Sequence, residues 1–321
     1  MNTNSKGSLS NKLIKPNKPN LFVRIGNDIK KNPQIYIMLI PVLLFYLLFH
    51  YKPMYGILMA FKDFSPRKGI LNSPWAGMKY FMQFFQSPYF FRTVRNTVVI
   101  NLLNLVFSFP APIILALLLN ELKDNIFKRT VQTITYMPHF ISTVVIVGII
   151  KALFAHNGVF TDLLVMMGME RANIVTLPQY FRTLYVASDI WQGVGWGSII
   201  YLASISGVDK ELYEAATVDG ASRLRKVISI TIPSIMPTIV VLLIMRIGSM
   251  MSLGHEKIIL LYNPNTYETA DVISSYVYRM GIEQGSFSYS AAVGLFNSVI
   301  NFALVIGANK FSKKATETSL W

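Results

Sequence analysis

Residues Ser206 to Pro237 read SGVDKELYEAATVDGASRLRKVISITIPSIMP and form a charged stretch between two apolar ones. The apolar windows are Thr183–Ile205 before it and Ile235–Leu253 after it, and each reaches the roughly 20 residues that a helix needs to cross a bilayer. A charged segment between two such windows is typical of a loop at a membrane surface. The stretch therefore predicts a protein built from transmembrane helices.

Windows of this kind recur along the 321 residues. The composition agrees with a membrane location, because 52% of the residues are hydrophobic, only 14% are charged, and the mean hydropathy is +0.43. We expect an all-α integral membrane protein with six transmembrane helices, near Ile35–Phe49, Val94–Leu119, Val131–Phe154, Thr183–Ile205, Ile235–Leu253 and Ser290–Ala308.

Lysine and arginine are distributed unevenly around these windows. They are more numerous in the two tails and in the segments after the second and fourth windows than in the remaining segments. This asymmetry predicts a multi-pass protein of the cytoplasmic membrane with both termini in the cytoplasm. The predicted organisation is a basic tail at 1–33, a first transmembrane helix at 34–50, an outer loop at 51–93, a core with five further helices at 94–309 and a second tail at 310–321.

Three residues inside the windows are unusual for lipid-facing helices. Gly193 and Gly197 form a GxxxG pair, which lets two helices approach closely and predicts a packing contact. Arg246 places a charge within the fifth window, so we expect it to point into the helix bundle or a water-filled cavity. It either pairs with a carboxylate or backbone carbonyls, or meets the passing solute.

Sequence signatures of catalysis are absent. The chain has no phosphate-binding GxxxxGK[ST] loop, HExxH pair, GxSxG elbow or cysteine, and its four histidines are scattered. We therefore expect neither an enzyme nor a metal site, and no cofactor bound by this chain. The net charge of +14 does not indicate nucleic-acid binding, because the basic residues largely flank the apolar windows.

The charged stretch itself predicts two short helices joined by a turn. Asp209 is placed to cap the first helix, and Asp219 with Gly220 supplies the turn, since glycine adopts the left-handed conformation that ends helices. A second, basic helix is expected after Ser222, and Pro233 marks the approach to the next span. Such a projection is compact and suited to contact with a partner.

The spacing of residues in this stretch resembles the EAA loop of permease subunits in binding-protein-dependent ABC importers. That pattern is EAA, three residues, G, nine residues, I, one residue, L and P. This chain departs from it only at Ile232, where leucine is usual. The matching residues, together with the neighbouring Asp219, are Glu214, Ala215, Ala216, Gly220, Ile230 and Pro233.

The resemblance extends beyond the loop. The chain from about Tyr80 to Lys310, including Asn96 and Thr97, looks like the core of a type I importer permease. The stretches GHEKIILLYNP (Gly254–Pro264) and ETADVISSYVYR (Glu268–Arg279) resemble a branch of carbohydrate permeases for oligosaccharides released from polysaccharides, including acidic ones of the alginate or pectin type.

This resemblance implies a set of partners. A second permease subunit would complete a heterodimer, an ATPase dimer would bind ATP and magnesium, and an extracytoplasmic solute-binding protein would deliver the oligosaccharide. The coupling loop, 207–233, would dock on the ATPase. The outer loops, Tyr51–Arg92 and Gly254–Tyr289, would contact the solute-binding protein.

Two other classes of protein, a secondary transporter and a membrane-embedded enzyme, are alternatives to a permease subunit. A secondary solute transporter would need an intramembrane polar site, for which Arg246 and Asp189 are the candidates, yet no inverted repeat is evident. A membrane-embedded enzyme would need convergent catalytic groups, and the sequence indicates none.

Overall fold

The computed structural model describes residues 28–316, which divide into two units; the boundary along the chain lies between Tyr55 and Gly56. In the first unit, helix α2 (Pro33–Tyr46) continues through a π-helical turn (Leu47–Tyr51) into the short helix α3 (Lys52–Met54). No residue of α2 is buried, and its large apolar side chains are exposed. A helix that is apolar on all sides suits a lipid environment.

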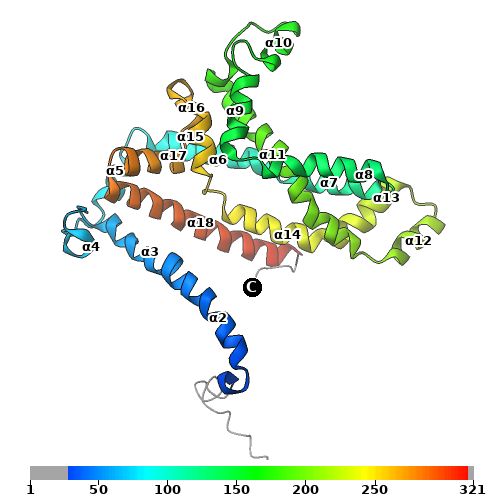
Figure 1. The fold of residues 1–321 in the computed structure, drawn as a ribbon, viewed down its shortest axis with the longest axis horizontal. Helices are drawn as coiled ribbons and strands as arrows, with labels where there is room; N and C mark the ends of the chain where they lie inside the picture. Colours follow the sequence, from blue (N-terminus) through cyan, green and yellow to red (C-terminus); the bar gives the residue numbers. More distant parts are fainter. Residues whose placement is uncertain (1–27, 317–321) are drawn as a thin grey trace, which may run out of the picture. The chain divides into compact units, whose positions relative to one another are not determined.

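The second unit is also built from helices (Figure 1). Its α-helices in chain order are α4 (Gly69–Asn72), α5 (Lys79–Phe85), α6 (Phe90–Leu103), α7 (Pro110–Glu121), α8 (Ile126–Tyr136), α9 (Thr143–Leu153), α10 (Val159–Met166), α11 (Pro178–Ser206), α12 (Lys210–Val218), α13 (Arg223–Lys226), α14 (Ile232–Gly248), α15 (His255–Leu261), α16 (Tyr267–Ala270), α17 (Ile273–Tyr278) and α18 (Phe287–Thr316).

Within residues 28–316, four helical stretches are long and apolar enough to cross a membrane: Pro33–Phe61, Phe90–Glu121, Arg223–Gly248 and Phe287–Lys314. They contain the first, second and sixth predicted windows. The fifth window was predicted to extend to Leu253, but its helix ends at Gly248. The fourth window lies in α11, which has 29 residues but is not among these four. Ser188, Asp189 and Gln192 lower its apolar content, and Ser188 is buried inside the protein.

The third window is not one straight helix. We predicted a continuous span over Val131–Phe154, but the chain forms Ile126–Phe140 and Thr143–Leu153, which are bent by 102°. Pro138, in the 3-10 turn Met137–Phe140, has no backbone N–H to donate, and Ser142 is extended. The prediction of a single continuous helix was therefore wrong at this point.

Polar groups freed by this break find partners within the chain. The Ser142 hydroxyl oxygen accepts a hydrogen bond from the backbone N–H of Val145 at 3.4 Å and so caps α9. The Gln192 side chain of α11 donates to the Ile141 carbonyl at 3.4 Å. Irregular backbone at membrane depth is stable where other parts of the protein satisfy it.

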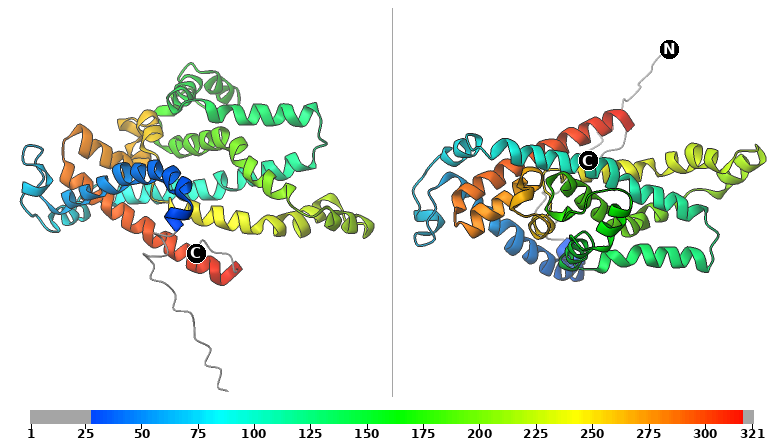
Figure 2. Two further views of the ribbon diagram at one scale, coloured as in Figure 1. Left: turned by 60° about the horizontal axis from the view of Figure 1, so that its bottom comes forward. Right: turned by 90° about the horizontal axis from the view of Figure 1, so that it is seen from above.

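The long helices of the second unit pack in pairs. Helix α11 packs against α7 and α8, and α14 lies beside α18 (Figures 1 and 2). Helices α12 and α13 lie at the opposite end of this unit from α5 and α17. The charged loop is thus separated from α5 and α17, which belong to the predicted outer loops, along the length of the helices.

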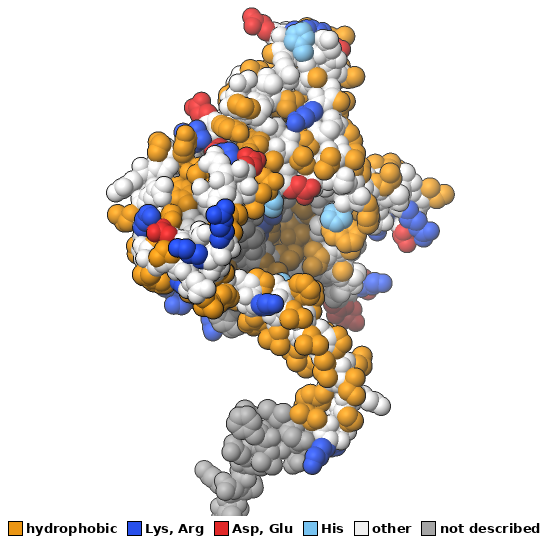
Figure 3. Space-filling view, turned by 60° about the vertical axis from the view of Figure 1, so that its left-hand side comes forward, with side chains coloured by type: hydrophobic (Ala, Val, Ile, Leu, Met, Phe, Trp, Pro, Cys, Tyr) orange, Lys and Arg blue, Asp and Glu red, His pale blue; other side chains and the backbone are white. Residues whose placement is uncertain are grey.

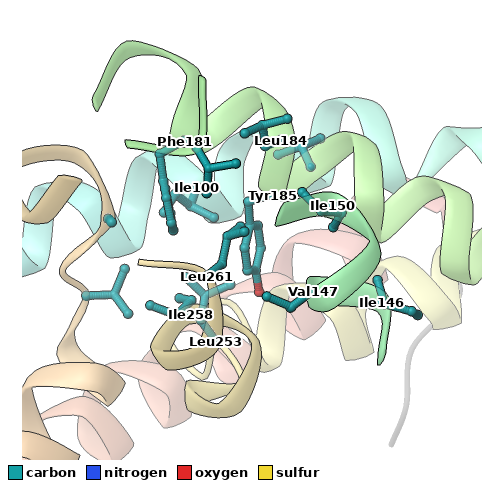
Figure 4. Packing of buried hydrophobic residues seen from close by; sticks show 14 of the residues in the cluster. Ile100, Ile146, Val147, Ile150, Phe181, Leu184, Tyr185, Leu253, Ile258 and Leu261 are labelled. Carbon is teal, nitrogen blue, oxygen red and sulfur yellow. The ribbon is translucent and has the colours of Figure 1, made fainter. Parts of the chain in front are cut away.

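The largest buried cluster joins α6, α9, α11 and α15 (Figure 4). Tyr185 of α11 lies among its members, which include Ile100, Ile146, Val147, Ile150, Phe181, Leu184, Leu253, Ile258 and Leu261. Ile258 and Leu261 are completely buried. The cluster therefore links α15 to α9, on which it packs, and to Tyr185 of α11.

Much of the remaining surface is apolar. Hydrophobic side chains cover broad areas of the face shown in Figure 3. Large apolar side chains on α7, α9 and α18 are exposed, among them Leu118, Val144 and Phe302. Exposed apolar surface of this extent is typical of a chain that meets lipid or other subunits.

Candidate functional site

The coupling loop begins with α12. The Asp209 carboxylate accepts a hydrogen bond from the backbone N–H of Glu211 at 3.0 Å, which confirms the predicted cap. Glu214 and Ala215 are exposed on α12, and Ala216 is half-buried. The small alanines leave the surface around the Glu214 carboxylate unobstructed.

The turn after α12 depends on Gly220. The backbone N–H of Ala221 donates to the Ala216 carbonyl at 2.9 Å, and that of Gly220 donates to the Thr217 carbonyl at 3.1 Å. These two bonds form a Schellman motif, in which the residue after the cap, here Gly220 after Asp219, is left-handed. Gly220 has φ +74°, which confirms the predicted turn.

Side chains tie the two arms of the loop together. Lys226 of α13 donates to the Thr217 hydroxyl at 2.8 Å, and the hydroxyls of Tyr213 and Thr231 lie 2.9 Å apart. Ser222 caps α13 by accepting from the backbone N–H of Arg225 at 3.3 Å. The loop is therefore an ordered projection rather than a simple connector.

The loop continues directly into the fifth predicted span. Ile230 lies in the π-helical turn Val227–Thr231, and Pro233 lies in the first turn of α14. A proline is well placed there because the first backbone N–H groups of a helix have no partner within it. A displacement of the loop is thus applied to the end of α14 itself.

A second candidate site is a cavity that brings together residues singled out within the predicted spans. A cavity of about 520 Å³ is lined by parts of α7, α11 and α14, and its lining includes Asp189, Gly193, Gly197 and Arg246. Arg246 thus faces a cavity, as predicted for a charge within a span.

Asp189 lies between two cations. Its carboxylate is 3.9 Å from the Arg246 guanidinium and 3.6 Å from the Lys257 ammonium. Both distances are longer than a hydrogen bond, so these are ion pairs only. Lys257 also lies 4.9 Å from the centre of the Tyr185 ring.

Lys257 was not singled out from the sequence, where the only signal is a lysine that opens the apolar run KIILL. Its side chain is 9% exposed. Burial lowers the pKa of the Lys257 ammonium, and the Asp189 carboxylate raises it in opposition.

The glycines of α11 differ in their surroundings. Within this chain, a Cβ at Gly197 would lie 3.0 Å from Pro112 of α7, whereas one at Gly193 would meet nothing within 4 Å. A Cβ at Gly195 would collide with the Thr135 carbonyl of α8. Close helix packing inside the chain therefore involves Gly195 and Gly197, and a packing role for Gly193 stays a prediction.

A buried polar network holds the start of α6. Asn96 is completely buried, and its amide donates to the carbonyls of Glu268 at 2.9 Å and Asp271 at 3.1 Å. The Thr97 hydroxyl accepts from the backbone N–H of Ile273 at 2.9 Å. The pair Asn96–Thr97 thus binds α6 to the segment that contains α16 and α17.

A buried carboxylate completes this network. Asp271 is fully buried and receives hydrogen bonds from Arg92 at 2.9 Å and from Arg279 at 2.7 and 3.1 Å. Two arginines therefore compensate one buried charge. Next to them lies a pocket of about 680 Å³ whose lining includes Tyr89 and Tyr267.

Residues 28–316 contain no group of three or more His, Asp or Glu side chains that could hold a metal ion.

Comparison with known proteins places the chain in a family. Residues 108–316 match the family described as binding-protein-dependent transport system inner membrane component. Protein LplB of Bacillus subtilis (strain 168) is 46% identical over 294 residues, which cover 91% of this chain and 92% of that protein. The polygalacturonan/rhamnogalacturonan transport system permease protein YteP of the same organism is 46% identical over 288 residues, 89% of this chain and 90% of that protein.

Solved structures agree with this result. A chain in the crystal structure of a bacterial alginate ABC transporter, in complex with alginate pentasaccharide-bound periplasmic protein, is 42% identical with a TM-score of 0.85. The match covers 92% of this chain and all of that one. A chain in a second crystal structure, of a bacterial ABC transporter involved in the import of the acidic polysaccharide alginate, is 43% identical with a TM-score of 0.84. This match covers 91% of this chain and 99% of that one. The protein therefore belongs to the inner membrane components of binding-protein-dependent transport systems, and is a transport subunit with the fold of a type I ABC importer permease.

Proposed function

We propose that this permease carries oligosaccharides, including acidic fragments of polysaccharides, across the cytoplasmic membrane by alternating access. The substrate class is supported by similar proteins named for polygalacturonan, rhamnogalacturonan and alginate. A second permease subunit completes the pathway, and a separate ATPase dimer binds ATP and magnesium. Both termini lie in the cytoplasm in this arrangement, as the distribution of lysine and arginine predicts.

The observation that carries the mechanism is the ordered, exposed coupling loop at 207–233. Glu214 presents a carboxylate to a basic partner, while the apolar side chains of Leu212, Val218 and Leu224 are exposed nearby. An apolar patch with a charged neighbour is suited to docking on another protein. We assign ATPase contact to Glu214, Ala215, Ala216, Asp219, Gly220, Ile230 and Pro233.

The cavity beside α11 and α14 is the proposed substrate path. Arg246 has a planar guanidinium that can bind a carboxylate or a pair of hydroxyls through two hydrogen bonds. Among the described residues its side chain makes no hydrogen bond, and its contact with Asp189 is long. The donors of Arg246 are thus available to a passing sugar.

The outer loops Tyr51–Arg92 and Gly254–Tyr289 form the proposed contact with the solute-binding protein. The network around Asp271 joins parts of both loops, because Arg92 comes from one and Arg279 from the other. Docking of the solute-binding protein on either loop would therefore act on α6 and α17 together.

A secondary transporter is not favoured. That reading relied on Asp189 and Arg246 as an intramembrane polar site, and the two do form an ion pair. The family to which the chain belongs, however, is defined by dependence on a binding protein.

The coupling role is tested by charge reversal in reconstituted vesicles. Glu214→Lys should reduce oligosaccharide uptake by about tenfold or more, because like charges would face each other across the docking surface. The measurement is ATP-dependent uptake with the binding protein present, after assembly of the complex has been confirmed by affinity purification.

Glu170→Lys is the matched control, because Glu170 is also exposed but lies in the loop between the third and fourth predicted spans. It should transport at the parental rate. Parental uptake by an assembled Glu214→Lys complex would contradict the coupling role.

A further inference from the structure

The charges around the cavity do not balance. Asp189 is the one carboxylate within 4 Å of Arg246 or Lys257 among the described residues, so one negative charge faces two positive ones. Which cation neutralises Asp189 decides whether Arg246 is left free. This question matters because Arg246 lines the cavity and Lys257 does not.

Burial favours Lys257 as the partner of Asp189. The Lys257 side chain is 9% exposed, whereas that of Arg246 is 42% exposed. A buried ammonium needs a counter-charge more than a hydrated guanidinium does, and an ion pair away from water is screened less. The distances agree, since Asp189 lies 3.6 Å from Lys257 and 3.9 Å from Arg246.

Packing of its neighbours on α15 positions Lys257. It lies next to Ile258 on α15, and Ile258 and Leu261 are fully buried in the cluster that contains Tyr185 (Figure 4). The Lys257 ammonium lies 3.5 Å from the Tyr185 carbonyl. Tyr185 and Asp189 are one helical turn apart on α11, so this packing holds the ammonium beside the carboxylate.

We infer that Lys257 is a specificity-determining residue: it neutralises Asp189 and thereby leaves Arg246 as the uncompensated positive charge of the cavity, which selects sugars that carry a carboxylate. The inference rests on the proposed function and deepens it. Lys257 acts through Asp189 and is a positioning residue that does not itself touch the sugar. Without it, Asp189 would pair with Arg246, and the cavity would lose its net charge.

The test compares two substrates of equal length, an oligogalacturonate and its fully methyl-esterified neutral form. Uptake of each is measured in vesicles that contain the whole complex, and is normalised to the amount of loaded binding protein. Lys257→Met should lower the ratio of acidic to neutral uptake by about tenfold, the size of effect expected when a charge-assisted contact is lost. Lys257→Arg keeps the charge and should keep the ratio.

A second substitution provides the rescue. In Asp189→Asn with Lys257→Met, Arg246 is again the free charge, so the ratio should return to the parental value. This double variant contains neither the Lys257 ammonium nor the Asp189 carboxylate, so its assembly does not depend on an ion pair between these two positions. An unchanged ratio in Lys257→Met, or a lowered ratio in the double variant, would overturn the inference.

The outcomes also separate this inference from the proposed function. If the parental complex imports neither substrate, the proposed substrate class is wrong. If Arg246→Met leaves the ratio unchanged, Arg246 is not in the substrate path and the inference is wrong with it. If Arg246→Met lowers the ratio and the Lys257 variants do not, the proposed function stands and the role of Lys257 alone is rejected.

Discussion

The turn of the coupling loop depends on the backbone conformation of Gly220. Its φ of +74° is strained for a β-branched side chain, and a Cβ there would meet nothing within 4 Å. Gly220→Val should therefore destabilise the loop by about 1 to 3 kcal/mol through backbone strain alone. We expect reduced uptake in vesicles together with faster proteolysis of the loop in the purified complex.

Gly220→Asn is the matched control, since asparagine tolerates the left-handed conformation better than other residues with a side chain. The Gly220→Asn variant should be intermediate between the parent and Gly220→Val, both in oligosaccharide uptake and in the rate of loop proteolysis. Equal behaviour of the valine variant and the parent would show that the turn does not need this conformation.

Contacts between residues close in sequence could be predicted, whereas contacts between distant residues could not. The cap by Asp209 and the turn at Gly220 follow from neighbours within a few residues, and the structure confirms both. The pairing of Lys257 with Asp189 joins positions far apart in the chain, so no spacing rule could indicate it. The GxxxG pattern likewise drew attention to Gly193, whereas the close approach of α8 is at Gly195, where a Cβ would collide with the Thr135 carbonyl.

At the scale of elements, Asn96 determines how α6 is attached to the segment around α16 and α17. Asn96→Ala should destabilise the protein by about 1 to 3 kcal/mol, because the carbonyls of Glu268 and Asp271 would lose their buried donor. We expect a lower melting temperature of the purified complex in detergent. Asn72→Ala, at an exposed position of α4, should leave it unchanged, and equal melting of both variants would argue against this attachment.

The positions of the elements were more predictable than their number or shape, because six spans were predicted and four helices of the described residues are long and apolar enough to cross a membrane. Apolar content located the long helices, because burial in lipid requires continuous apolar sequence. It did not reveal the 102° break in the third window, since apolar residues occur on both sides of the break. Pro138 was the available signal, and its effect depends on whether Ser142 and Gln192 can satisfy the freed backbone.

At the scale of the whole molecule, the topology remains open to a direct test. The chain has no native cysteine, so single cysteines can be labelled without background. Asn265→Cys, in an exposed position of the predicted outer loop, should react with an impermeant thiol reagent added to intact cells. Ser8→Cys, which lies outside the described residues, should react only after the cells are opened.

The control is labelling of both variants in permeabilised cells, which shows that each thiol is reactive. Labelling of Ser8→Cys in sealed cells would reverse the predicted orientation. The arrangement of the helices agrees with the prediction to this extent: the coupling loop and the segments around α5 and α17 lie at opposite ends of the second unit.

The break in the third window also has a mechanical consequence. A straight helix acts as a stiff rod, but α8 and α9 are two rods joined at Ile141–Ser142. Helix α8 rests on α11, whereas α9 packs against α15. A shift of α8 along α11 can therefore be taken up as rotation at this hinge, so that α9 and the helix α15 packed against it need not move with α8.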